Sequence, residues 1–376
     1  MYNVDTISLL LDFRIINSNF FTSNLKTIQY LDYKIKSKLY EFTDEITGEK
    51  KWKGKYNGYN LYYNSKWNAL TSQIPHNKIE KLTADEILEI FKYSMMQLFQ
   101  LKETEIPEIK LSRIDIKNDY LCKNEEELKI IKYIILKVKD KFRNYEKTYK
   151  KDDTEGYSVK YLSHKKNKEG TEYDETLQSF KTFEIKLSDE VDETSGYIEY
   201  SFYDKGQETK FRIEKGEADE TELEKYKNIF RSEVKIKNKR LNSYLFENKR
   251  MTKDLGTYYN KEMTEELYHK YMKQIIGPQD FYRIDVALSI IDDSNFRSNK
   301  KEKLKELLLL INTKGYGVSN EEWIERYSKA TFYSHIRSIE SLGINVITFP
   351  VTITGQSVKA RKVKNFTLFK NGVTEV

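Results

Sequence analysis

Short runs of aromatic and β-branched residues recur through the first two thirds of the chain, and they constrain its fold more than any other feature. Such runs, separated by polar residues, are typical of β-strands. Two stretches with helical spacing interrupt them: one opens with the capping box Thr83-Ala84-Asp85-Glu86, and the other follows Asn124. The pattern predicts an α+β domain with a mostly antiparallel sheet, whose strands are expected at residues 4–14, 34–42, 56–63, 67–73, 110–118, 180–187, 197–204 and 230–236.

The pattern becomes helical beyond residue 250, so we expect a second domain, 251–376, to follow the first, 1–250. Helices followed by a basic hairpin are typical of a winged helix-turn-helix, which binds DNA through one helix and the hairpin. A plain helical dimerisation domain is the alternative. Helices are expected at 262–276, 279–291, 300–313 and 319–342, and strand-like runs at 345–354 and 358–369.

Residues 331–339 are the expected recognition helix of this second domain. Helical spacing turns Ile336 and Ile339 toward the core. The other side of the helix is expected to face a DNA groove, while the basic residues of the hairpin are expected to touch phosphate. The groove-facing residues are Ser334, His335, Arg337 and Ser338, and the hairpin residues are Lys359, Arg361, Lys362 and Lys364.

The charge of the 376 residues is nearly balanced, with 65 Lys and Arg against 59 Asp and Glu, yet the basic residues are clustered. Residues 137–151 and 231–250 each hold seven Lys or Arg against two acids, while acids gather at 214–224. Local basic tracts favour a polyanionic partner, although solvated helix faces have a similar composition.

Cysteine content and hydropathy exclude several classes of protein. The single cysteine, Cys122, rules out a disulfide framework and a cysteine-rich zinc site. The longest apolar run, 307–311, is far shorter than the ~18 residues of a membrane span, and the amino end lacks the basic segment of a secretory signal. We therefore expect a cytoplasmic protein without a membrane partner.

Three of the expected strands each pair an apolar face with a charged one, because side chains alternate along a strand. In the strand at 110–118, for example, Ile114 and Ile116 share the apolar face. If the three strands are neighbours, their charged faces form one polar site. These faces hold Arg113, Asp115 and Lys117 in the first strand, Glu199, Ser201, Tyr203 and Lys205 in the second, and Arg231, Glu233, Lys235 and Lys237 in the third.

Two carboxylates on these faces, Asp115 and Glu233, suit a hard cation such as Mg²⁺ or Mn²⁺, which prefers oxygen ligands and bridges to phosphate. A tyrosine hydroxyl beside such a cation can attack phosphorus and form a covalent link. Tyr203 lies on these faces, and its ordinary pKa of ~10 requires a neighbouring cation such as Lys205 to favour the phenolate. Cross-strand ion pairs on a solvated sheet face are the alternative.

Three segments carry a resemblance to a known family. Residues 203–208 read Tyr-Asp-Lys-Gly-Gln-Glu, residues 113–115 read Arg-Ile-Asp, and residues 231–237 read Arg-Ser-Glu-Val-Lys-Ile-Lys. The first resembles the Tyr-x-Lys-x-x-Glu nucleophile segment of rolling-circle replication initiators, and the second resembles their Arg-hydrophobe-Asp strand. The third resembles a strand of the gene II/X replication proteins of filamentous phages. Residues 75–78 and 307–345 resemble further elements of plasmid and phage members.

The resemblance implies a nicking–joining enzyme that cuts one strand at a phage or plasmid replication origin, leaving a 3′-OH primer and a 5′-phosphotyrosine. It implies a sheet domain like that of HUH endonucleases at 1–250. The implied partners are duplex and single-stranded origin DNA, a host helicase and a second copy of the chain. By match, Tyr203 is the nucleophile, and Asp115 and Glu233 are ligands of Mg²⁺ or Mn²⁺. Lys205 and Arg231 would be phosphate or structural partners, and Lys205 is expected to be catalytic as well. The expected DNA-binding residues are Arg113, Arg231, Lys235, Lys237, Arg337, Lys359, Arg361, Lys362 and Lys364.

The histidines depart from the HUH pattern. His76, His164, His269 and His335 are scattered, so they form no His-hydrophobe-His pair that would hold the metal. His164 is either a third ligand or DNA contact, or a surface residue in a basic loop. Tyr161 is a rival nucleophile, because it too lies in a strand-like segment followed by cations.

Three other functions stay open. A non-catalytic winged-helix initiator or repressor would leave Tyr203 without a catalytic role. A conjugative relaxase would share the chemistry, and an RNA-binding protein would show no origin preference. Aromatic residues of the early strands are expected either to stack on extruded bases or to lie in the sheet core: Tyr56, Tyr59, Tyr62, Tyr63 and Trp67.

Overall fold

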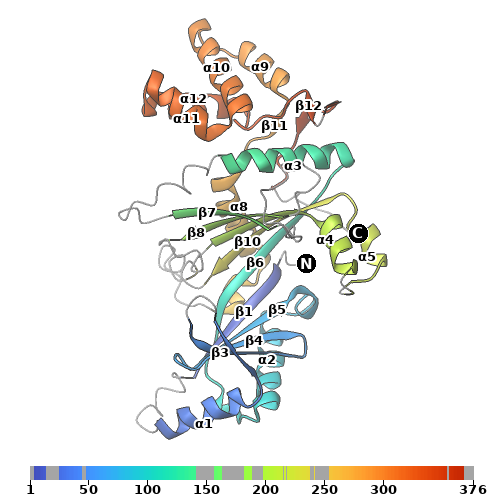
Figure 1. Ribbon diagram of the computed structural model, residues 1–376, viewed down its shortest axis with the longest axis vertical. Helices are drawn as coiled ribbons and strands as arrows, with labels where there is room; N and C mark the ends of the chain where they lie inside the picture. The colour runs from blue at the N-terminus through green and yellow to red at the C-terminus, as the bar shows by residue number, and fades with distance from the viewer. Residues whose placement is uncertain are drawn as a thin grey trace. The chain divides into compact units, whose positions relative to one another are not determined.

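Contacts within the chain divide the protein into two units, and Figure 1 labels most of their helices and strands. Unit 1 comprises Met1–Lys117 and Lys235–Tyr268, and unit 2 comprises Asn118–Val234 and His269–Val376. Each unit therefore combines two separate stretches of the chain. The computed structural model describes residues 4–13, 25–44, 48–140, 156–162, 182–188, 198–214, 216, 218–237, 241, 254–353 and 355–367.

Unit 1 is built on an antiparallel sheet with the strand order β2-β3-β4-β5-β1-β6. Ile7, Leu9 and Leu11 alternate along β1, so they share one face, and all three are completely buried. The strands are β1 (Val4–Asp12), β2 (Tyr40–Thr43), β3 (Lys50–Tyr56), β4 (Tyr59–Asn64), β5 (Ala69–Pro75) and β6 (Ile109–Leu121), the last of which continues into unit 2.

Two helices, α1 (Leu25–Lys36) and α2 (Ala84–Phe99), pack on one face of the β3–β4–β5 meander. The Tyr63 hydroxyl donates a 2.8 Å hydrogen bond to Asp32 of α1. The rings of Tyr59 and Phe91 in α2 lie 5.9 Å apart. Because Tyr59 and Tyr63 point to the same side of β4, both helices lie on that side of the sheet.

Both helix starts that the sequence predicts are confirmed. The amide of Glu86 donates to the Thr83 hydroxyl at 3.3 Å, and the amide of Thr83 donates to the Glu86 carboxylate at 2.7 Å. The amide of Glu127 donates to the Asn124 side chain at 2.9 Å. These bonds satisfy amides that have no partner in the first turn of a helix.

Unit 2 holds a sheet with the order β6-β10-β9-β8-β7 and one long helix, α3, which contacts β9. Ile131 and Ile135 of α3 are completely buried, as their helical spacing predicts. The three strands expected to carry polar faces, β6, β9 and β10, are thus consecutive neighbours. The elements are α3 (Glu125–Asp140), β7 (Gly156–Leu162), β8 (Thr182–Ser188), β9 (Ile198–Asp204), α4 (Lys205–Glu214), α5 (Thr221–Lys225) and β10 (Ile229–Lys237).

Helices dominate the remainder of the chain. Trp323 and Phe332 are completely buried where α10, α11 and α12 contact one another. The elements are α7 (Leu255–Tyr258), α8 (Lys261–Ile275), β11 (Phe281–Tyr282), α9 (Ile284–Asp292), α10 (Ser298–Lys314), α11 (Tyr316–Arg326), α12 (Lys329–Glu340), β12 (Thr352–Ile353), β13 (Gln356–Ser357) and β14 (Lys362–Val363). Within the described residues, no helix combines the length and the apolar composition needed to cross a membrane.

The predicted α+β architecture, with an antiparallel sheet in the amino-terminal part and helices later, is confirmed. Two of the predicted strands are wrong in detail. Residues 34–42 contain the last turn of α1, and the strand β2 begins only at Tyr40. Residues 56–63 are not one strand, because Asn57 and Gly58 form a turn with φ values of 50° and 83° that joins β3 to β4. Asn-Gly is the preferred pair for such a hairpin turn.

Two predictions in the carboxyl-terminal part also need correction. The expected helix 319–342 is divided between α11 and α12, because the Ser328 hydroxyl accepts a hydrogen bond from the Thr331 amide at 3.1 Å and caps a new helix. Within the described residues of the two long strands expected at 345–354 and 358–369, the strands are only two residues long. In this region the Asn345 amide donates to the Asp280 carbonyl and the Phe349 amide to the Tyr282 carbonyl, and each bond belongs to an isolated bridge and not to a continuous strand pair.

Candidate active site

Tyr203 and Glu233 lie on the neighbouring strands β9 and β10 of unit 2 and contact each other directly. The Tyr203 hydroxyl donates a 2.5 Å hydrogen bond to Oε1 of Glu233. Glu233 is only 5% exposed, whereas Tyr203 is half-buried. A charge-assisted bond of this length between a phenol and a carboxylate is strong. This bond places a proton acceptor, Oε1 of Glu233, beside the phenol oxygen with which a tyrosine nucleophile would attack.

Lys205 lies two residues beyond Tyr203, at the start of α4. Its Nζ lies 2.6 Å from Oε2 of Glu208 and 5.9 Å from the centroid of the Tyr203 ring. A second ring, that of Tyr226, has its centroid 5.1 Å from the same Nζ. The lysine and the glutamate of the Tyr-x-Lys-x-x-Glu segment therefore form an ion pair with each other beside the tyrosine.

Asp204 fixes the end of β9, directly between Tyr203 and Lys205. Its carboxylate accepts from the Gln207 amide at 3.1 Å, which caps α4. The same carboxylate lies 2.6 Å from Nζ of Lys132 in α3, and both side chains are buried. This pair ties the strand that carries Tyr203 to the long helix of unit 2.

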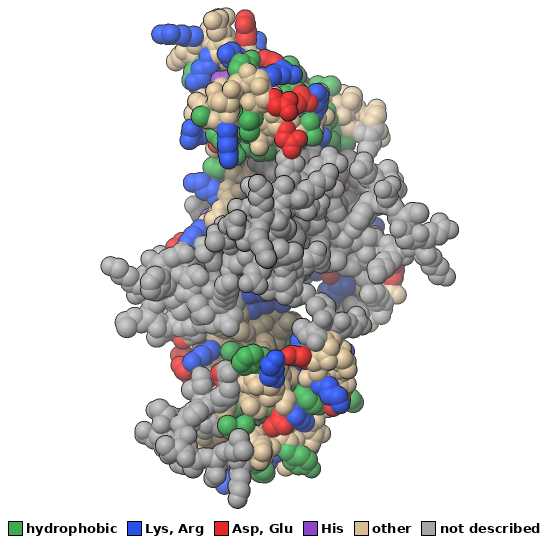
Figure 2. Space-filling model, turned by 60° about the vertical axis from the view of Figure 1, so that its left-hand side comes forward, with side chains coloured by type: hydrophobic (Ala, Val, Ile, Leu, Met, Phe, Trp, Pro, Cys, Tyr) green, Lys and Arg blue, Asp and Glu red, His purple; other side chains and the backbone are tan. Residues whose placement is uncertain are grey.

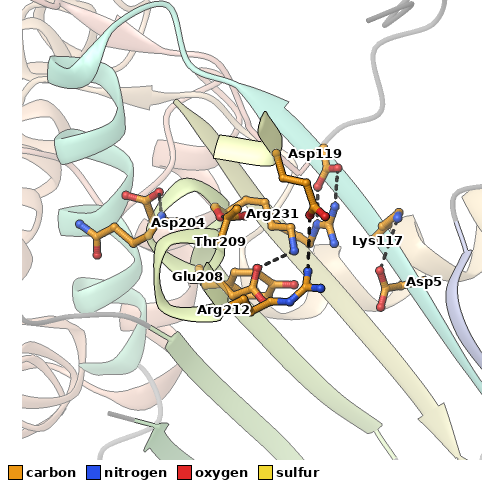
Figure 3. Close-up of polar contacts among 12 residues, drawn as sticks. Asp5, Lys117, Asp119, Asp204, Glu208, Thr209, Arg212 and Arg231 are labelled. Atoms are coloured by element: carbon orange, nitrogen blue, oxygen red, sulfur yellow. Dashed lines mark hydrogen bonds and ion pairs between the residues drawn. The ribbon is translucent and has the colours of Figure 1, made fainter. Parts of the chain in front are cut away.

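Arg231, an expected DNA contact, is buried in unit 2. Its Nε and Nη2 donate to the two oxygens of Asp119 at 2.6 and 2.7 Å (Figure 3). A bidentate pair of this kind holds both side chains in fixed geometry. Arg231 as placed therefore joins β10 to β6.

Asp115 and Arg113 form a second charged group, within unit 1. The Arg113 guanidinium donates to both oxygens of Asp115, at 2.6 and 2.5 Å. Burial raises the pKa of Asp115, while the charges of Arg113 and Lys235 act in the opposite direction. Further along β6, Lys117 lies 3.4 Å from Asp5 (Figure 3).

The pairing of the two expected ligands bears directly on a metal ion. Both oxygens of Asp115 accept from Arg113, and Oε1 of Glu233 accepts from Tyr203. Among the described residues, no group of three or more His, Cys, Asp or Glu side chains is placed to hold an ion. With their side chains in these pairs, Asp115 and Glu233 do not fit the Mg²⁺ or Mn²⁺ site that the sequence predicts. The metal ion itself stays a prediction.

Most of the expected DNA contacts in the carboxyl-terminal part lie at the surface. The exposed residues are Arg337, Lys359, Arg361, Lys362 and Lys364. His335, expected to face a groove, is instead buried, and its ring lies 5.8 Å from that of Trp323 in an edge-on contact. The reason is its position on α12, where it shares the buried side with Phe332 and Ile339.

The remaining candidates can be placed one by one. Lys235 and Lys237 are half-buried on β10. Tyr200 is completely buried and donates to the Tyr271 carbonyl at 3.3 Å, which confirms its place in the core. Tyr161 lies in β7, where its backbone pairs with that of β8, and His164 lies outside the described residues.

Three residues of this site were not predicted from the sequence. Asp119 continues the alternation of charged residues along β6, so the same period-two pattern could have identified it. Lys132 and Asp204 lie 72 positions apart, and no local pattern in the sequence indicates that they meet.

Comparisons with protein-family models, with curated proteins and with solved structures found no match to the chain.

Proposed function

We propose that the chain is a nicking–joining enzyme that forms a covalent phosphotyrosine with one DNA strand through Tyr203. The observation that carries the proposal is the 2.5 Å hydrogen bond from the Tyr203 hydroxyl to the buried carboxylate of Glu233. A base in direct contact with a weak nucleophile is the arrangement that nucleophilic catalysis requires.

In the proposed reaction, the Tyr203 oxygen attacks the phosphorus of a phosphodiester while its proton passes to Glu233. The bond from phosphorus to the 3′ oxygen breaks, and that oxygen takes a proton from solvent. The products are a 3′-OH and a 5′-phosphotyrosine. Joining is the reverse: a 3′-OH attacks the phosphotyrosine, and Tyr203 leaves with a proton returned by Glu233. The ion pair of Lys205 with Glu208 keeps a cation beside the Tyr203 ring.

The order of the parts along the chain supports initiation of rolling-circle replication as the biological role of this chemistry. The antiparallel sheet would act in nicking, as in HUH endonucleases but without their paired histidines. The segment from α10 to β14 would read duplex origin DNA in the manner of a winged helix, with Arg337 and Lys359 among its exposed cations. A conjugative relaxase is the alternative that uses the same chemistry.

A non-catalytic DNA-binding initiator or repressor is the second candidate, and the burial of the site favours it. Glu233 and Arg231 are each about 5% exposed, as expected of groups that hold a sheet together. In that case, the exposed cations of the carboxyl-terminal part would carry the whole function.

A nicking assay separates the two candidates. Supercoiled plasmid carrying the DNA that flanks the coding sequence would be incubated with wild-type protein, Tyr203→Phe and Tyr161→Phe in the presence of Mn²⁺. We expect the wild type and Tyr161→Phe to convert supercoiled into open-circular plasmid with protein attached to the 5′ end, and Tyr203→Phe to do neither. Specific binding of the plasmid without nicking by any of the three would support the non-catalytic candidate.

A further inference from the structure

One face of the β2–β5 meander in unit 1 carries alternating aromatic and basic side chains. The register pairs Tyr40 of β2 with Lys53 of β3, and Lys53 with Tyr62 of β4. Residues paired across antiparallel strands point to the same side, so the three form a row across the sheet. With a strand spacing of about 4.8 Å, the two tyrosines lie roughly 9.6 Å apart, with the lysine between them.

This row is open on the side that faces away from α1 and α2. Tyr40 is 79% exposed and Tyr62 is 41% exposed, and Lys53 is exposed as well. By contrast, Tyr59 and Tyr63, which alternate with Tyr62 along β4, are buried beneath the helices. The early aromatic residues therefore divide into a core set and an exposed set.

The charge of the open face is positive. Lys51 and Lys55 lie on the same side of β3 as Lys53, and at the described strand positions of this face in β2–β5 there is no Asp or Glu. Lys51 lies 2.6 Å from Asp44, just beyond β2. Phe42 lies on this side too, with its ring centroid 4.9 Å from Nζ of Lys53. On the side of the molecule drawn in Figure 2, hydrophobic, basic and acidic side chains are interspersed among the described residues.

We propose that this face, which we call the Tyr40–Tyr62 face, binds single-stranded DNA. Bases stack on exposed aromatic rings whatever their sequence, and lysines attract the phosphates between the bases. A polyanion with planar bases fits a row of tyrosine, lysine and tyrosine better than a protein surface would, because the face has cations without carboxylates among its strand positions. The choice of DNA over RNA rests on the proposed function. The binding itself does not.

The test measures the fluorescence anisotropy of a labelled single strand of mixed sequence, titrated with the full chain. All variants carry Tyr203→Phe as well, so that no covalent product forms. Tyr40→Ala and Tyr62→Ala are each expected to weaken binding about tenfold, the loss typical of one stacked base. Lys53→Ala is expected to lower the slope of log affinity against log salt by about 0.7.

Tyr93→Ala is the matched control, since Tyr93 is a 61% exposed tyrosine of α2, on the other side of the sheet. Its affinity should equal that of the parent chain. Equal losses in Tyr62→Ala and Tyr93→Ala would overturn the proposal, and so would equal losses for single strand and duplex of the same sequence. A preference for RNA of the same sequence would overturn the choice of DNA. A dimer in sedimentation that Tyr62→Ala dissociates would assign the face to a second copy instead.

The proposal and the tyrosine chemistry fail separately. If Tyr40→Ala and Tyr62→Ala weaken binding while the wild type forms no covalent product, the face stands and the nicking proposal falls. If the wild type forms a product and all variants bind alike, the reverse holds.

Discussion

The hydroxyl of Tyr203 on β9 donates a 2.5 Å hydrogen bond to Oε1 of Glu233 on β10. Two residues 30 positions apart thus meet on adjacent strands, in the arrangement that a tyrosine nucleophile and its base would need. The carboxylate is buried, and its Oε1 accepts from the group that it would deprotonate in the proposed reaction. In the proposed reaction Glu233 is the base, a role other than the metal ligation that the resemblance implies.

Glu233→Gln should lower the rate of cleavage about 10²- to 10⁴-fold, because the amide keeps the shape of the side chain but accepts no proton. Single-turnover cleavage of the target strand measures this rate constant. Glu127→Gln is the control, since Glu127 is also a buried glutamate that accepts from a tyrosine hydroxyl, that of Tyr120 at 3.0 Å. Equal rate constants for Glu233→Gln and Glu127→Gln would contradict the general-base role.

Lys132→Met should lower the free energy of unfolding by about 3–5 kcal/mol, because it leaves the buried carboxylate of Asp204 without its cation. Adding Asp204→Asn should restore much of the loss, since the amide is neutral and still caps α4. Urea unfolding curves of both variants measure the change. A solvated ion pair contributes under about 1 kcal/mol to the free energy of unfolding. A loss this small in Lys132→Met would show that the ion pair does not anchor β9.

His335 should make the protein less stable in mild acid. Burial, followed by the charges of Lys303 and Lys300, lowers the pKa of His335 in the folded chain. The unfolded chain then binds the proton more readily, so the stabilisation is complete above about pH 6.5 and declines as the pH falls below it. Urea unfolding at a series of pH values measures the decline.

His335→Phe should reduce this dependence on pH while keeping the edge-on contact with Trp323. Part of the pH dependence should remain in this variant because of His76, whose pKa is lowered mainly by burial and then by Lys117. An identical pH dependence in His335→Phe and the wild type would exclude His335 as its source.

Chelation tests the expected divalent cation separately from the tyrosine. The resemblance to replication initiators predicts that EDTA stops cleavage and that Mg²⁺ or Mn²⁺ restores it, since a cation neutralises charge on the phosphate. The nicking assay on supercoiled plasmid, with and without EDTA, is the measurement. Cleavage that persists in EDTA would remove the ion and leave the base role of Glu233 in place.

Local patterns in the sequence predicted the elements around the site well. The alternation along β6, β9 and β10 indicated which residues share a face, and the strands are neighbours, which is the condition that the prediction of one polar site required. The caps at Thr83 and Asn124 were predictable because each bond joins residues three positions apart. The Asn57-Gly58 turn was missed, although its signal is local, because the lysine-rich strand β3 before it lacks the usual strand composition.

Contacts between distant residues could not be predicted in this way. Period two shows that Tyr203 and Glu233 each lie on a polar face, but whether they meet depends on the pairing of β9 with β10. The buried ion pair of Lys132 with Asp204 depends on how α3 packs on the sheet. The burial of His335, by contrast, follows from a local pattern, because His335 lies three positions after Phe332 and four before Ile339, on the buried side of α12.

The tyrosine that carries the DNA can be identified in the covalent product itself. After cleavage of a target strand by the wild-type chain, the covalent product would be digested with protease and nuclease, and the modified peptide mapped by mass spectrometry. Tyr200→Phe, which removes a buried hydroxyl from the opposite face of β9, is the control and should yield the same product. We predict a nucleotide attached to Tyr203 and to no other tyrosine. A nucleotide on a different residue, or a product that forms equally well with Tyr203→Phe, would contradict the account.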